Sequence, residues 1–203
     1  QRYRRFHFQR DQHLYLVAHA LVRTTLSRYV DVAPECWQFS VNRYGRPEID
    51  AAQGALAPLR FNLSHTHGLA ACIVTQLVDC GVDVEREHDL DDMMTLAKTV
   101  FSRHEREALA AVPTAGRKSR FFDYWTLKES YIKARGMGLS LPLDAFSFQF
   151  VGERLAGVDF DLSLQDDPAQ WQFEVDRIGA SHHKLAVAIR RGDSPERRVM
   201  CRY

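Results

Sequence analysis

Hydrophobic side chains recur every three or four residues in three long segments of the chain, which is the spacing of one buried face of an α-helix. Residues 11–30 keep this spacing for about five turns. Residues 89–112 predict one or two further helices, with Phe101 and Leu109 in the core and Pro113 as a stop. The last predicted helix ends at Gly136, because glycine readily adopts the backbone conformation that closes a helix.

Short segments rich in β-branched and aromatic residues lie between and after these helices, and they predict β-strands. In the first part of the chain these are residues 37–41, 61–66, 69–77 and 80–85. After the last helix, residues 141–151, 159–164, 171–179 and 184–191 predict an antiparallel meander. The order helix, strands, helix, strands indicates an α+β fold with two related halves, residues 1–80 and 81–203.

Composition and charge narrow the class of protein. The 203 residues are 45% hydrophobic, which suffices for a buried core, and no apolar run is long enough to predict a membrane span. Basic residues number 27 and acidic residues 26, so the chain carries no strong field toward nucleic acid or membrane. We therefore expect a cytoplasmic protein. The cysteines lack CxxC spacing and are interpreted as free, mostly buried thiols: Cys36, Cys72, Cys80 and Cys201.

The last predicted helix carries an acid in an unusual place. At 3.6 residues per turn, Glu129 falls on an otherwise apolar stripe with Phe122, Trp125 and Ile132. Lys133 follows one turn later, and a helical ion pair worth about 0.2–0.5 kcal/mol would by itself explain the two charges. Beside a metal ion and a phosphoester, the same ammonium could instead neutralise charge on a leaving phosphate.

Two further acids lie in a predicted strand. Asp83 and Glu85 flank Val84, so both carboxylates point to one side of the strand and can bind a hard cation. This spacing alone is common on strand edges. With Glu129 as a third acid it predicts a magnesium site, since Mg²⁺ takes few protein carboxylates and fills its other positions with water and phosphate oxygens.

Other polar residues at turns offer phosphate contacts. The segment FNLSHTHG presents Ser64 and His65 where a strand ends. His65 and His67 would be half of a transition-metal site, but no matching third ligand follows. Arg46 lies between two turn formers, Gly45 and Pro47, and can be a surface hairpin residue or a phosphate ligand.

Three blocks of the sequence together point to a family. FNLSHT, GVDVE and WTLKESYIKARGMGLSLPLDAFSF resemble, in order and spacing, the signature of Sfp-type 4′-phosphopantetheinyl transferases. The resemblance implies a pseudo-twofold monomer of two α+β halves that binds coenzyme A and Mg²⁺ in the cleft between them. It also implies transfer of the phosphopantetheine arm to a serine of an apo acyl-, peptidyl- or aryl-carrier protein, with release of adenosine 3′,5′-bisphosphate.

The resemblance also implies roles for single residues. Asp83, Glu85 and Glu129 match the metal-binding acids of the family. Glu129 also matches the acid that activates the serine, and Lys133 matches the lysine near the transferred phosphate.

Four more residues match positions that contact coenzyme A. They are Ser64, His65, which would face the 3′-phosphate, and the basic residues Arg2 and Arg46. Leu14 departs from the pattern, because relatives often carry an arginine there. The chain begins without a methionine, and we expect a preceding segment with the family's usual first strand to be missing.

Two other functions remain as alternatives to a transferase, and one surface patch is a candidate docking site for the carrier protein. The same acids could hold Mg²⁺ in a coenzyme A or nucleotide-binding module that transfers nothing. Nucleic-acid binding through the N-terminal arginines is disfavoured, because the net charge is +1 and no aromatic-basic platform follows. Met93 and Met94 could form an adaptable apolar patch for a carrier protein, although such methionines are commonly part of a core.

Overall fold

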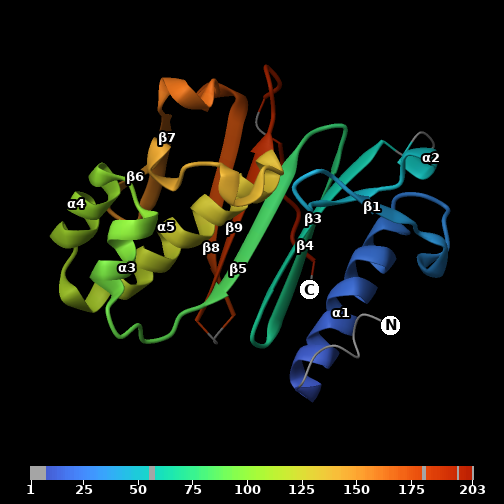
Figure 1. The fold of residues 1–203 in the computed structure, drawn as a ribbon, viewed down its shortest axis with the longest axis horizontal. Helices are drawn as coiled ribbons and strands as arrows, with labels where there is room; N and C mark the ends of the chain where they lie inside the picture. The colour runs from blue at the N-terminus through green and yellow to red at the C-terminus, as the bar shows by residue number, and fades with distance from the viewer. Residues whose placement is uncertain (1–7, 55–57, 180–181, 196, 203) are drawn as a thin grey trace.

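The computed structural model describes residues 8–54, 58–179, 182–195 and 197–202. Figure 1 shows two groups of helices and strands side by side, which meet where β3 and β5 run next to each other. The α+β class expected from the order of elements is confirmed.

The first group packs one long helix on a β-hairpin. Helix α1 (Gln9–Leu26) covers β3 (Leu59–Thr66) and β4 (Leu69–Gln76), which pair antiparallel (Figure 1). The predicted helix is confirmed but ends earlier than residue 30, so Tyr29 is exposed. A small core of Val22, Leu26, Trp37 and Phe61 fixes this packing. The shorter elements are η2 (Pro34–Cys36), β1 (Phe39–Val41), β2 (Pro47–Ile49) and α2 (Ala51–Gly54).

The second group begins with β5 (Cys80–Arg86) and three helices. The segment expected to form one or two helices forms two, α3 (Met93–Val100) and α4 (Arg103–Ala111). Ser102 separates them, because its side chain caps the backbone N–H of Glu105 while the Glu105 carboxylate accepts from the N–H of Ser102. Phe101 and Leu109 are buried in the core, as predicted.

The C-terminal strands do not form the expected single meander. They make two separate antiparallel hairpins, and β9 lies between β5 and β8 in a three-stranded sheet. That prediction was wrong because β5, far upstream in the chain, provides the second edge with which β9 pairs. The elements are β6 (Phe146–Val151), β7 (Arg154–Phe160), β8 (Trp171–Ile178) and β9 (His183–Arg190), with η3 (Gly138–Ser140), η4 (Leu143–Ala145), η5 (Leu162–Leu164) and η6 (Pro168–Gln170).

Helix α5 (Thr114–Arg135) is buried on more than the one face that its pattern predicted. It ends at Gly136 in the left-handed conformation, as expected. Phe122 and Ile132 are buried, but so is Lys128, whose ammonium lies 2.8 Å from a Glu105 carboxylate oxygen. The helix packs on β5 and β9 (Figure 1), and its Tyr124 and Tyr131 rings contact Phe150 and Phe146 of β6, so polar groups on several faces need partners inside the protein.

The cysteines are free thiols, as expected, but they are not mostly buried. Only Cys80 is buried, while Cys36 and Cys201 are exposed. Burial raises the pKa of the Cys80 thiol to about 11. Among the described residues, no helix is long and apolar enough to cross a membrane.

Candidate active site at the junction of β3 and β5

Strands β3 and β5 are joined by side chains instead of a ladder of backbone hydrogen bonds. Asn62 Oδ1 accepts from the backbone N–H of Val82 at 3.0 Å, and Ser64 Oγ accepts from that of Val84 at 3.3 Å. The constant offset of 20 residues means that the two strands run parallel. The polar side chains satisfy buried backbone donors of β5 and bring its carboxylates against the first half.

A lysine, a serine and a carboxylate meet at this junction. Lys133 Nζ lies 2.5 Å from Asp83 Oδ1 and 2.9 Å from Ser64 Oγ. Ser64 Oγ donates to the same Asp83 oxygen at 2.8 Å. Asp83 is only 3% exposed, and its second oxygen, Oδ2, is buried with no hydrogen-bond partner among the described residues. One oxygen of this carboxylate is therefore held by the protein while the other is unpaired.

Two more acids lie around this cluster. Glu85 accepts a hydrogen bond from the Thr66 hydroxyl at 3.3 Å, and the Trp125 side chain lies close enough to lower the pKa of this carboxyl. Burial and the nearby charge of Asp83 raise its pKa. Burial and Asp83 likewise raise the pKa of Glu129, and the Lys133 ammonium opposes this shift. The three carboxylates are thus close enough to repel each other, with one ammonium beside them.

This donor set suits an oxygen-seeking cation. Within the described part of the chain, no three His, Cys, Asp or Glu side chains lie close enough together to hold a metal ion by themselves. Mg²⁺ does not need such a group, since it typically uses one or two carboxylates together with water and substrate oxygens. A cation bound here would supply a partner for the unpaired oxygen of Asp83 and would offset the mutual repulsion of Glu85 and Glu129. The residues present therefore fit the group, and their assignment as metal ligands stays a prediction.

The structure brings some predicted residues together and leaves others apart. Ser64 belongs to the cluster, whereas His65 is exposed and, as the next residue of the strand, points to the opposite face. Lys133 pairs with Asp83 and not with Glu129, the helical neighbour that the sequence suggested. Arg2 lies outside the described residues.

The side chain of Arg46 is nearly covered and lies against the end of α5. Its guanidinium donates to the carbonyl oxygens of Ala134 and Cys80 at 2.7 and 3.3 Å. It is therefore neither an exposed hairpin residue nor a member of the lysine and acid cluster. Its assignment to a coenzyme phosphate stays a prediction.

Sequence reasoning gave no role to three residues that shape the site. Asn62 and Thr66 flank Ser64 at alternate positions, so their spacing could have indicated one polar face of a strand. Trp125 was interpreted as an apolar residue, yet its side chain lies close enough to Glu85 to lower the pKa of that carboxyl. Only the meeting of α5 with β5 creates that contact.

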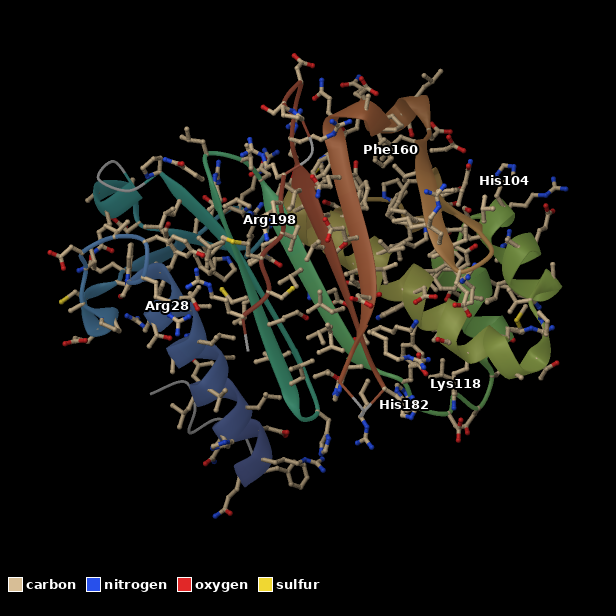
Figure 2. The ribbon with its side chains drawn as sticks, turned by 180° about the vertical axis from the view of Figure 1, so that it is seen from behind. Arg28, His104, Lys118, Phe160, His182 and Arg198 are labelled. Atoms are coloured by element: carbon tan, nitrogen blue, oxygen red, sulfur yellow. The ribbon has the colours of Figure 1, made fainter. Side chains whose placement is uncertain are left out.

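A polar cavity of about 620 Å³ opens beside Thr66 and Glu85, at the edge of the cluster. Its wall combines the tip of the β3–β4 hairpin with the loop after β5 and the first turns of α5. Lys118, labelled in Figure 2, projects from α5 at this end of the molecule, near the tip of the β8–β9 hairpin marked by His182. The lining residues are Thr66, His67, Glu85, Arg86, Glu87, His88, Asp89 and Lys118.

Comparison with known proteins agrees with the expected family. A family model described as 4′-phosphopantetheinyl transferase superfamily matches residues 79–189, and one described as 4′-phosphopantetheinyl transferase, N-terminal, matches residues 1–77. The chain is 32% identical over 201 residues to 4′-phosphopantetheinyl transferase Sfp of Bacillus subtilis, which covers 98% of the chain and 84% of that relative.

Other similar proteins are more distant or cover less of the chain. The chain is 35% identical over 136 residues to 4′-phosphopantetheinyl transferase HetI of Nostoc sp., which is 67% of the chain and 57% of that relative. A crystal structure of Thermotoga maritima holo-[acyl-carrier-protein] synthase aligns with a TM-score of 0.44 and 16% identity, over 55% of the chain and 62% of that protein. From the two family models and the nearly full-length similarity to Sfp, we conclude that this chain belongs to the 4′-phosphopantetheinyl transferase superfamily.

Proposed function

We propose that this transferase takes the 4′-phosphopantetheine group from coenzyme A and attaches it to a serine of an apo acyl-, peptidyl- or aryl-carrier protein. The serine oxygen forms a bond to the phosphorus that carries the pantetheine arm. The bond from that phosphorus to the bridging pyrophosphate oxygen breaks, and adenosine 3′,5′-bisphosphate leaves. The observation that carries this proposal is the contact of Lys133 with Ser64 and Asp83, with Glu129 in the same charged cluster.

The two catalytic residues of the proposal are Glu129 and Lys133. A serine hydroxyl is a poor nucleophile near neutral pH and needs a base. Glu129 is a carboxylate in the same charged cluster, and it accepts the serine proton directly or through one water. The Lys133 ammonium then stabilises negative charge on the departing phosphate.

The acids at the junction are the proposed metal ligands. Asp83, Glu85 and Glu129 would hold Mg²⁺, which supplies Lewis-acid neutralisation of the pyrophosphate charge when bound. The unpaired buried oxygen of Asp83 and the mutual repulsion of the glutamates support this assignment.

The remaining assignments concern coenzyme and carrier contacts. Ser64 and Lys133 are proposed to contact coenzyme A in the cluster, and His65 on the exposed side of β3 to contact its 3′-phosphate. Met93 and Met94 are half-buried and pack against the core of the second half, so their docking role stays a prediction.

We further propose that the enzyme acts as a monomer in the cytoplasm. A single chain contributes every residue of the cluster, from β3, β5 and α5. The cysteines are free, as is usual in a reducing compartment.

Intact mass spectrometry tests the function directly. A panel of apo carrier proteins is incubated with the enzyme, coenzyme A and Mg²⁺, and we expect at least one carrier to gain the mass of one phosphopantetheine group. A carrier whose acceptor serine is replaced by alanine is the control and should gain nothing. Binding of coenzyme A without a mass gain on any carrier would favour a non-catalytic coenzyme A-binding module and overturn the proposal.

A further inference from the structure

A turn in the first half of the chain holds the end of α5 in the second half. Asn42 Nδ2 donates to the carbonyl oxygen of Gly136 at 3.0 Å, and Arg46 Nη1 donates to that of Ala134 at 2.7 Å. Arg46 Nη2 donates to the carbonyl oxygen of Cys80, the first residue of β5, at 3.3 Å. One guanidinium therefore bridges the last turn of α5 and the start of β5.

The turn that presents these donors is itself held by hydrogen bonds. Asn42 Oδ1 accepts from the backbone N–H groups of Tyr44 at 2.9 Å and Arg46 at 3.0 Å. Gly45 supplies the left-handed conformation that the turn needs, with φ of +87°. An asparagine that closes its own turn in this way stabilises it, so Asn42 and Arg46 reach α5 from a preformed loop.

Both donors serve groups that the helix cannot satisfy alone. The last carbonyl groups of a helix have no partner within it, and the helix dipole favours positive charge at this end. Gly136 fits the close approach, because a Cβ there would lie 2.8 Å from Cδ of Arg46. The first half of the chain thus supplies the cap of the helix in the second half.

The low exposure of the Arg46 side chain favours a role as a cap of α5 over a role as a ligand at the surface. Its side chain is 8% exposed, and Nη1 also lies 3.8 Å from a carboxylate oxygen of Asp79. To bind a coenzyme phosphate, the guanidinium would have to give up the carbonyl groups of Ala134 and Cys80.

We propose that Arg46 and Asn42 are positioning residues that hold the Lys133 ammonium at Asp83. Lys133 immediately precedes Ala134 on α5, and Asp83 is the third residue after Cys80 on β5, so the Arg46 bridge joins the two elements that carry the pair. This inference rests on the proposed transfer function and names what orients its lysine. Small displacements matter here, since a shift of about 1 Å in a reacting group can cost about 100-fold in rate.

Steady-state kinetics with coenzyme A and a carrier test the role in the reaction. For Arg46→Met we expect kcat to fall about tenfold or more while KM for coenzyme A changes less than about threefold. Asn42→Ala should lower kcat in the same direction but less, and Arg46→Lys should recover part of the loss. Arg60→Met is the matched control, because Arg60 also pairs with Asp79 at 3.9 Å but its other ion pair is with Glu48, away from α5.

Hydrogen exchange supplies a second readout that needs no turnover. Backbone amides in the last turn of α5 and the first residues of β5 should exchange faster in Arg46→Met and Asn42→Ala, but not in Arg60→Met. This result stands even if no tested carrier is modified, so failure of the positioning role is distinguishable from failure of the transfer function. If Arg46→Met does not fold, hydrogen exchange in Arg46→Lys and Asn42→Ala tests the positioning role instead.

Two outcomes would overturn the proposal. One is unchanged exchange in both Arg46→Lys and Asn42→Ala. The other is an intact kcat in the Arg46 variants with a raised KM for coenzyme A that disappears when dephospho-coenzyme A is the donor, which would make Arg46 a ligand of the 3′-phosphate.

Discussion

The Lys133 ammonium lies 2.5 Å from Oδ1 of Asp83, although 50 positions separate these residues in the chain. The pair exists only where α5 packs on β5, and Ser64 from β3 donates to the same oxygen. The contacts of Lys133 therefore require α5, β5 and β3 to pack together. Replacing Lys133 tests directly whether this site carries out the reaction.

Replacing Lys133 by methionine should lower kcat by about 10²–10³, the range typical for loss of one group that stabilises transition-state charge. The measurement is turnover of an apo carrier at saturating coenzyme A. Lys98→Met removes the same charge from an exposed position on α3 and should leave turnover unchanged. Wild-type turnover in Lys133→Met would remove the lysine from the mechanism.

Glu129→Gln should lower kcat by about 10²–10⁴, because the amide keeps the shape of the side chain but cannot accept the serine proton. Single-turnover kinetics separate this loss from product release. Glu107→Gln, on the exposed face of α4, serves as the charge control. If Glu129→Gln turns over near the wild-type rate, the carboxylate is neither base nor essential metal ligand.

The free energy of unfolding should depend on pH through Glu129. Its pKa is raised above 4.5 in the folded chain, first by burial and then by Asp83, so the folded state binds its proton more tightly than the unfolded state. Its contribution to stability therefore falls as pH rises from the ordinary value toward the raised pKa. The difference in unfolding free energy, wild type minus Glu129→Gln, should decrease across this window in chemical denaturation without divalent ions.

Mg²⁺ should restore part of the unfolding free energy that the wild type loses as pH rises, because a bound cation offsets the repulsion among the carboxylates. Thermal unfolding at neutral pH should show a higher Tm with Mg²⁺ for wild type and a smaller gain for Glu129→Gln. A difference in unfolding free energy that stays flat with pH, or an equal Mg²⁺ gain in both proteins, would contradict the charge coupling described for this site.

Gly81→Ala should destabilise the protein by about 1–3 kcal/mol or more, because added volume has nowhere to go in a tight contact. A Cβ on Gly81 would lie 2.0 Å from the carbonyl oxygen of Ser130 and 2.5 Å from the backbone nitrogen of Ala134. Urea denaturation measures the loss. Gly157→Ala has no atom within 4 Å of the added carbon and should change stability little. Equal stability of the two variants would show that α5 and β5 are not closely packed.

Much of the local structure followed from neighbouring residues. The end of α5 at Gly136 and the core positions Phe101 and Leu109 were predicted because capping and periodicity depend on residues a few positions apart. The prediction of a single meander was wrong because β9 pairs with β5. No pattern within residues 141–191 indicates that β5 is the partner. The family was recognisable because three motifs kept their order and spacing.

The sequence by itself determined the elements, the family and the residue types that carry charge, since these depend on local patterns. It placed an acid on α5, two acids on one side of β5 and a lysine one turn beyond Glu129. Only the tertiary structure decided that Lys133 pairs with Asp83 and that Arg46 turns inward to α5. The physical reason is that a buried charge takes the partner that packing brings within reach, and packing joins residues that the chain keeps far apart.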